Sequence, residues 1–155
     1  MNLAHRIIAR CTRRSPDFVI GGADRPYLLR WFVIPRNRFF NVYLHQFLRS
    51  DDDRALHDHP WANLSILLHG SYLEHTIDAG GIEQCRLLSQ GDVRVRLSGK
   101  FAHRVELFDG PCWTLFITGP RYRQWGFHCP KAGWVHWERF TAAHDSGSIG
   151  RGCDA

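Results

Sequence analysis

Short runs of branched and aromatic residues, separated by regularly spaced turns, most constrain the fold of this 155-residue chain. Turn sequences typical of β-hairpins occur at Asp78-Ala79-Gly80-Gly81 and Asp109-Gly110, and Ser98-Gly99 marks another turn. Predicted strands lie on either side of these turns, at 27–34, 39–48, 62–76 with a break at Gly70, 82–88, 93–97, 103–108, 112–118 and 134–140. Many short strands at this spacing favour an all-β barrel or jelly roll.

The two ends of the chain differ from this strand-rich part. Residues 4–14 predict a short amphipathic helix, which Ser15-Pro16-Asp17 ends. The C-terminal end is rich in Gly and Ser, which predicts fraying. Because no repeat or linker divides the rest, we expect an N-terminal helix and lead-in over 1–26, a single barrel domain over 27–142 and a flexible tail over 143–155.

The composition argues against several classes of partner. A hydrophobic content of 44% and a charged content of 23% are typical of a globular domain. The net charge of +5 comes from arginine, since only Lys100 and Lys131 are lysines. No compact basic patch interleaved with aromatic residues and no known nucleic-acid-binding module is present, so we expect no nucleic-acid partner. No apolar run approaches the ~20 residues that span a bilayer, so we expect no membrane association.

Cysteine usage bears on the compartment. The five cysteines form an odd set without a C-x-x-C pair, which argues against a disulfide framework and favours a reducing compartment. The first fifteen residues contain four arginines and no acid, a composition that transit peptides share, but a short helix is the preferred interpretation. The expected location is therefore the cytoplasm.

Three histidines have the spacing of a metal site. In His57-Asp58-His59 the two imidazoles point to the same face of a strand, because side chains alternate with a period of two. A third ring, His103, from a distant strand completes a set that leaves coordination positions open for water, substrate or dioxygen. The sequence therefore predicts one divalent metal at His57, His59 and His103. The alternative is that these rings are hydrogen-bonded polar residues of a barrel that holds no metal.

These residues resemble the two sequence motifs of the cupin superfamily. The matching positions are His57-Asp58-His59 and Gly70 for the first motif, and Gly91-Asp92-Val93, Gly99 and His103 for the second. The resemblance covers about residues 40–118. It implies a cupin-type double-stranded β-helix, a jelly-roll barrel, here with a short N-terminal helix added. The segments that begin at Trp113 and Trp125 look like those of small uncharacterised bacterial and phage cupins.

The chain departs from the cupin pattern at several positions. Asn63 stands where the family usually has a metal-binding Glu, while Asp51, Leu97 and Leu107 replace a Gly, a Pro and an Asn. Three neutral imidazoles leave the metal its full +2 charge, which favours an anionic substrate. Asn63 could hydrogen-bond a metal-bound water or coordinate weakly through its amide oxygen. Three-histidine thiol dioxygenases within the superfamily make Fe(II) the favoured metal, with Zn or Ni as alternatives.

The predicted strands also suggest residues that could line a substrate pocket. If Asp109-Gly110 is a two-residue hairpin turn, His103 lies opposite Phe116 and Val105 opposite Thr114. Thr114 and Phe116 would then be pocket neighbours of the third histidine.

Two further pairs of residues have a functional and a structural interpretation. Tyr43 and His45 share one face of a strand, where they could bind substrate or act as acid and base; otherwise they are a core residue and a hydrogen-bonded structural one. Arg121 and Arg123 could anchor an anionic substrate at the rim, or form a solvated basic loop.

Arg94 and Arg96 alternate with Val93 and Val95 and are expected to point away from the apolar side. Barrels of this type pair through edge strands, which makes a homodimer a reasonable expectation.

The site is compatible with several functions. The favoured one is a mononuclear non-haem Fe(II) three-histidine oxygenase that acts on a small anionic metabolite. The alternatives are a redox-neutral Zn or Ni isomerase, lyase or hydrolase, a non-catalytic barrel that binds a small molecule, and a structural protein.

Overall fold

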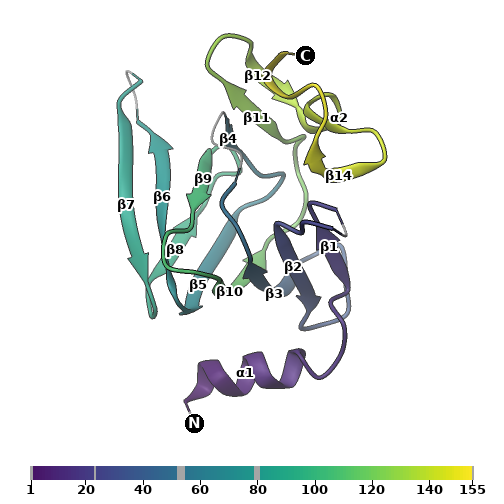
Figure 1. The fold of residues 1–155 in the computed structure, drawn as a ribbon, viewed down its shortest axis with the longest axis vertical. Coiled ribbons are helices and arrows are strands. Elements are labelled where there is room, and N and C mark those ends of the chain that lie inside the picture. The colour runs from purple at the N-terminus through teal and green to yellow at the C-terminus, as the bar shows by residue number, and fades with distance from the viewer. Residues whose placement is uncertain (1, 23, 52–54, 79–80, 155) are drawn as a thin grey trace.

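The computed structural model describes residues 2–22, 24–51, 55–78 and 81–154, and it contains two six-stranded antiparallel sheets (Figure 1). The first sheet has the order β1 (Phe18–Ile20), β2 (Leu28–Phe32), β3 (Asn41–Phe47), β10 (Cys112–Thr118), β5 (Asn63–His69) and β8 (Val93–Arg96). The second has the order β12 (Gly133–His136), β11 (Gly126–Cys129), β4 (Leu56–His57), β9 (His103–Glu106), β6 (Ser71–Ile77) and β7 (Glu83–Ser89). This arrangement confirms the predicted all-β jelly roll.

Side chains from both sheets meet in the interior. Leu67 of β5 and Cys112 of β10 pack against Tyr72, Leu88 and Val105 of the opposite sheet. Burying these apolar surfaces is the main favourable contribution to the stability of the barrel. The cluster fills part of the space between the sheets and leaves the rest as a cavity.

The predicted N-terminal helix is present as α1, Leu3–Cys11, which ends three residues before the expected limit. Asn2 caps it by accepting a hydrogen bond from the backbone N–H of His5. Ile7, Ile8 and Cys11 pack against Trp31 and other apolar residues of the first sheet. None of the helices among the described residues is long and apolar enough to cross a bilayer.

The break between β5 and β6 lies at Gly70, as the sequence predicts. Its φ of +83° is in the left-handed region that favours glycine. An added Cβ would also lie 3.0 Å from the Cβ of Cys112. The chain therefore passes from one sheet to the other at a glycine, which tolerates both the positive φ and the close approach to Cys112.

The predicted hairpin at Asp109-Gly110 is wrong. β9 pairs with β4 and β6, whereas β10 pairs with β3 and β5, so the turn carries the chain from one sheet to the other. Turn residues reverse the direction of the chain but do not decide which strand pairs with which. Strand pairing depends on how the apolar faces of the strands are buried in the interior. In the observed register Thr114 pairs with His45, and Phe116 with Tyr43.

The orientation predicted for β8 is also wrong. Val93 and Val95 are exposed, while Arg96 is 5% exposed and Arg94 is partly buried. The arginines point inward because a buried carboxylate, Glu74, receives both of them. The edge strands are β1 and β8 in the first sheet and β12 and β7 in the second. Pairing of two copies through such edges stays a prediction.

The C-terminal part contains secondary structure, while the flexibility of the tail over 143–155 stays a prediction. The predicted strand over 134–140 is divided into β12 and a short helix α2, Trp137–Phe140. β13 (Thr141–Ala142) pairs with β14 (Asp145–Ile149), and a 3-10 helix follows at Gly152–Asp154.

A disulfide between Cys129 and Cys153 links β11 to the C-terminal 3-10 helix, contrary to the argument from the odd cysteine count. Sequence spacing could not reveal this pair, because its two cysteines are brought together only when the C-terminal segment folds back. The cytoplasmic location stays a prediction.

Removing the disulfide is expected to loosen the C-terminal segment. For a bridge that closes 24 residues, Cys153→Ser should lower the free energy of unfolding by about 3 kcal/mol. Thermal unfolding and limited proteolysis would measure this change. The matched control is Cys85→Ser, because Cys85 is an exposed free thiol. Equal unfolding temperatures and equal cleavage for the two variants would contradict the disulfide.

Candidate metal centre

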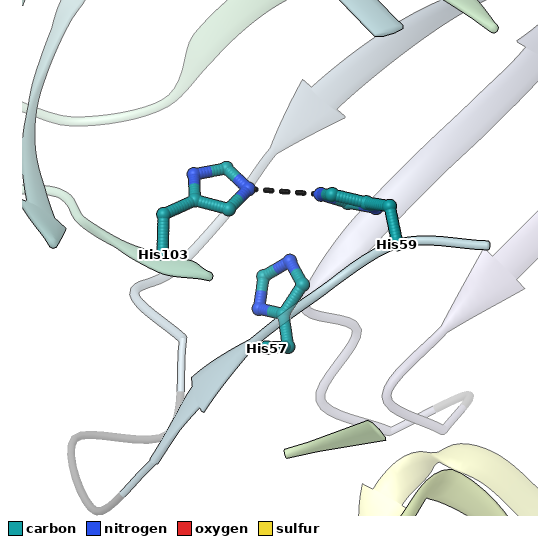
Figure 2. Close-up of side chains that lie close together, drawn as sticks. All are labelled: His57, His59 and His103. Carbon is teal, nitrogen blue, oxygen red and sulfur yellow. Dashed lines mark hydrogen bonds between the residues drawn. The ribbon is translucent and has the colours of Figure 1, made fainter. Parts of the chain in front are cut away.

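The three histidines come from neighbouring parts of the second sheet (Figure 2). His57 is the last residue of β4 and pairs directly with His103, the first residue of β9. His59 follows β4, and its backbone N–H donates to the carbonyl of Gly99 at 2.9 Å. A Cβ on Gly99 would lie 2.3 Å from the carbonyl oxygen of His59, so this approach requires glycine.

The imidazole nitrogens of the three side chains converge. The atoms that could bind a metal all lie within 4.8 Å of one another. Figure 2 shows the closest pair, Nε2 of His59 and Nε2 of His103, which are 3.0 Å apart. Among the described residues no other group of three potential ligands has this proximity.

Burial keeps two of these rings neutral. It lowers the pKa of His59 and of His103 well below the ordinary value of 6.5, and neighbouring positive charges add to the effect. A neutral imidazole has a lone pair available for a metal, whereas an imidazolium does not. At neutral pH the rings of His59 and His103 are therefore uncharged nitrogen donors.

A buried carboxylate orients His103. Oε1 of Glu74, on β6, lies 2.9 Å from Nδ1 of His103 and also accepts from Arg96. Oε2 of the same group accepts from Nε of Arg94 at 3.1 Å. Because Nδ1 of His103 donates to Glu74, Nε2 carries the lone pair and faces His59.

Sequence reasoning missed Glu74. The signal was the alternation in β6, where the buried residues Tyr72 and Glu74 share a face.

A second carboxylate lies beside His57. Oδ2 of Asp51 is 3.6 Å from Nδ1 of His57 and accepts from the backbone N–H of Val105 at 2.7 Å. The other nitrogen of His57 is thereby free to face the remaining two rings. Asp51 stands where the cupin motif usually has a Gly, so this departure places a carboxylate behind a histidine.

Asn63 is connected to the three rings through a chain of polar contacts. Its Oδ1 accepts from Arg96 at 3.5 Å, Arg96 binds Glu74, and Glu74 binds His103. Its Nδ2 is buried without a hydrogen-bond partner. The amide therefore contacts the arginine that holds Glu74. Its expected contact with a metal or a metal-bound water stays a prediction.

The histidines open into a cavity of about 580 Å³ between the two sheets. Of the pocket residues expected from the sequence, His45, Thr114 and Phe116 line it. Phe116 approaches His59 with 5.7 Å between ring centroids. Tyr43 is buried behind His45, with its ring stacked on that imidazole at 5.9 Å.

Arg121 and Arg123 do not line this cavity. Arg121 is exposed and donates to Gln124 at 2.7 Å. Arg123 pairs with Asp58 at 2.9 Å, because Asp58 points to the opposite side of the strand from His57 and His59. That buried carboxylate also accepts from the backbone N–H of Gly126, so both sides of the His-x-His segment are held in place.

Other arginines line the cavity in their place. Among the described residues its charged lining side chains are Asp51 and the four arginines Arg30, Arg36, Arg49 and Arg96. The two cavity tyrosines stay protonated at neutral pH, since burial raises the pKa of Tyr72 to about 12 and that of Tyr27 well above 10. Positively charged side chains therefore predominate in the lining of the cavity around the three imidazoles.

The donor set fits a divalent metal ion. Three imidazole nitrogen ligands converge, and two of them have a carboxylate near the other ring nitrogen, an arrangement that fixes ring orientation at metal centres. His57, His59 and His103 are the residues that would hold the ion. No carboxylate among the described residues joins them.

Comparison of the sequence with protein-family models and with curated proteins finds no match. Solved structures with a similar fold include Fe(II) HppE in complex with substrate, with a TM-score of 0.54, 13% sequence identity, and coverage of 68% of this chain and 57% of that chain. An oxalate decarboxylase from Bacillus subtilis, studied for its Mn(II) centres, gives a TM-score of 0.51, 17% identity, and coverage of 75% and 30%. KdgF from Halomonas sp. gives a TM-score of 0.50 and 18% identity, with coverage of 65% of this chain and 87% of that chain.

This chain spans less than two thirds of the length of the HppE and oxalate decarboxylase chains. At sequence identities this low, the similarity to these structures concerns the fold alone. The two antiparallel sheets, the histidine motifs and these structural matches together show that the chain has the cupin fold.

Proposed function

We propose that this protein is a mononuclear metal-dependent cupin enzyme that uses Fe(II) and dioxygen to oxidise a small anionic metabolite. The observation that carries the proposal is the convergence of three histidines at a cavity lined by four arginines and one aspartate. The HppE and oxalate decarboxylase structures, with Fe(II) and Mn(II), give examples of metal centres on a similar fold.

The charge of the site supports an anionic substrate. Three imidazoles leave a divalent ion its full charge, whereas a carboxylate ligand would cancel one unit. The cavity arginines add positive charge in a region where apolar walls reduce screening by water. An anion that enters is attracted both by the ion and by these side chains.

The spacing of the rings supports a metal with open positions. At a metal–nitrogen distance of about 2.1 Å, two ligands at a right angle lie about 3.0 Å apart, and at the tetrahedral angle about 3.4 Å apart. The observed 3.0 Å between the Nε2 atoms of His59 and His103 matches the first value. The three donor atoms as a set lie within 4.8 Å of one another. Three ligands on one side of a non-haem Fe(II) ion would leave positions for substrate and dioxygen.

When bound, Fe(II) supplies the redox chemistry and adjacent positions for substrate and dioxygen. The chain itself supplies orientation and exclusion of water. Glu74 fixes the ring plane of His103 through a hydrogen bond, and Asp51 places a negative charge 3.6 Å from Nδ1 of His57. Phe116 and Phe127 lie 5.7 and 6.2 Å from the nearest site imidazole, measured between ring centroids, and cover part of the site with apolar surface.

Metal content is the first measurement. Untagged protein is expected to contain close to one equivalent of iron by elemental analysis, while His57→Ala and His103→Ala should contain little because each loses one of three ligands. His69→Ala is the matched control, since His69 lies at the exposed end of β5. Absence of metal from the parent after reconstitution would overturn the metal-dependent function, and stoichiometric Zn or Ni would favour redox-neutral chemistry.

Oxygen uptake tests the reaction. Iron-loaded protein mixed with a panel of small carboxylates, thiols and diketones is expected to consume oxygen with at least one anionic compound, and the metal-free protein should not. An oxygen electrode and product analysis by mass spectrometry provide the readout. Turnover that continues without oxygen would instead identify an isomerase, lyase or hydrolase.

Glu74 is expected to set the metal affinity without touching the metal. In Glu74→Gln the side chain keeps its size but loses its charge, so iron affinity should fall by about 10- to 100-fold. Thermal stability should fall too, because Arg94 and Arg96 lose their carboxylate. Competition with a chelator, at a temperature where circular dichroism shows a folded variant, measures the affinity. Glu106→Gln is the control, and unchanged affinity in Glu74→Gln would show that the carboxylate is only structural.

A further inference from the structure

Arg30 is a charged cavity side chain without an opposite charge. It lies on β2, where it pairs with His45 of β3, and it lines the cavity. No carboxylate among the described residues forms an ion pair with it. Arg96 in the same cavity differs, because Glu74 neutralises it.

The contacts of Arg30 leave one edge of its guanidinium available. Nε donates to Nε2 of His45 at 2.8 Å. The face of the group lies over the ring of Tyr43, with 4.8 Å from Cζ to the ring centroid. The two terminal nitrogens form no hydrogen bond with a described residue. They form the end of a planar fork, the geometry that binds a carboxylate through two parallel hydrogen bonds.

The protonation states suit this arrangement. Burial lowers the pKa of Arg30 to about 10, which still leaves it charged at neutral pH. Burial and the charge of Arg30 lower the pKa of His45 well below 6.5, so His45 is neutral and accepts the hydrogen bond from Nε. A buried cation without a partner is costly, and an anionic ligand would offset that cost.

Arg30 and the three histidines are close enough for one small molecule to reach both. His45 stacks on Phe116 at 5.2 Å, and Phe116 lies 5.7 Å from His59, both measured between ring centroids. Phe116 thus separates the His45–Arg30 pair from the three histidines by one aromatic ring. Both groups open into the same cavity.

We propose that the terminal nitrogens of Arg30 bind a carboxylate group of the substrate, while the other end of that molecule faces His57, His59 and His103. The second half of this statement rests on the proposed function, whereas the carboxylate site does not. His45 is a positioning residue, because it fixes the rotation of the guanidinium through Nε. Tyr43 covers one face of the group, so a ligand binds at its edge, where the two parallel hydrogen bonds of a carboxylate fit.

Binding to the full chain without metal tests the site separately from catalysis. Protein treated with a chelator is titrated with acetate, benzoate and succinate, with their amides and with inorganic phosphate, by calorimetry. At least one carboxylate is expected to bind saturably, and more tightly than its amide and than phosphate. Arg30→Gln should weaken that binding by about tenfold or more, since two charge-assisted hydrogen bonds are lost.

Two further variants make the result specific. Arg30→Lys keeps a charge and a donor for His45 but lacks the fork, and it is expected to weaken binding as well, which covers the case that Arg30→Gln fails to fold. Arg121→Gln removes an exposed arginine outside the cavity and should leave affinity unchanged.

Several outcomes would overturn the proposal. The proposal fails if no carboxylate binds the parent protein saturably, or if a carboxylate and its amide bind with equal affinity. It also fails if Arg30→Gln or Arg30→Lys binds the carboxylate as tightly as the parent does. Carboxylate binding in a protein that never takes up metal would leave this site intact and overturn the proposed function alone.

Discussion

The buried carboxylate of Glu74 is the interaction on which most of the site depends. It lies on β6 of the second sheet and binds Arg94 and Arg96 of β8 in the first sheet, so it joins the two layers of the barrel. It also binds Nδ1 of His103. A charge that is 1% exposed requires such partners, because removal from water without compensation costs several kcal/mol. The same contacts that satisfy Glu74 therefore align β8 and direct a histidine toward the cavity.

The arginines of this chain serve two different purposes. Arg96 and Arg123 are neutralised by buried carboxylates and hold the segments around the histidines. Arg30 has no such partner among the described residues and faces the cavity. What distinguishes these arginines is whether a carboxylate of the chain forms an ion pair with them. An arginine without such a partner is available to bind an anionic ligand.

Much of the fold could be predicted because its signals are local. Alternating hydrophobic residues and glycine-containing turns gave the positions of most strands, and Gly70 marked the passage between β5 and β6. The Asp109-Gly110 turn does not reveal its partner strand, since a reversal of the chain is compatible with a partner in either sheet. Hydrophobicity alone places the valines of β8 in the interior, because it does not reveal the buried carboxylate opposite the arginines. The order of strands and the inward face of β8 thus required contacts distant in sequence.

The sequence by itself determined the three histidines, since a period of two places His57 and His59 on one face wherever the strand lies. Only the tertiary structure decided which groups surround them. Glu74 and Asp51 reach the rings, Arg30 lines the cavity, and Arg121 and Arg123 lie outside it. The physical reason is that a residue's orientation within a strand follows from local geometry, whereas the charges that meet across a barrel depend on how two sheets pack.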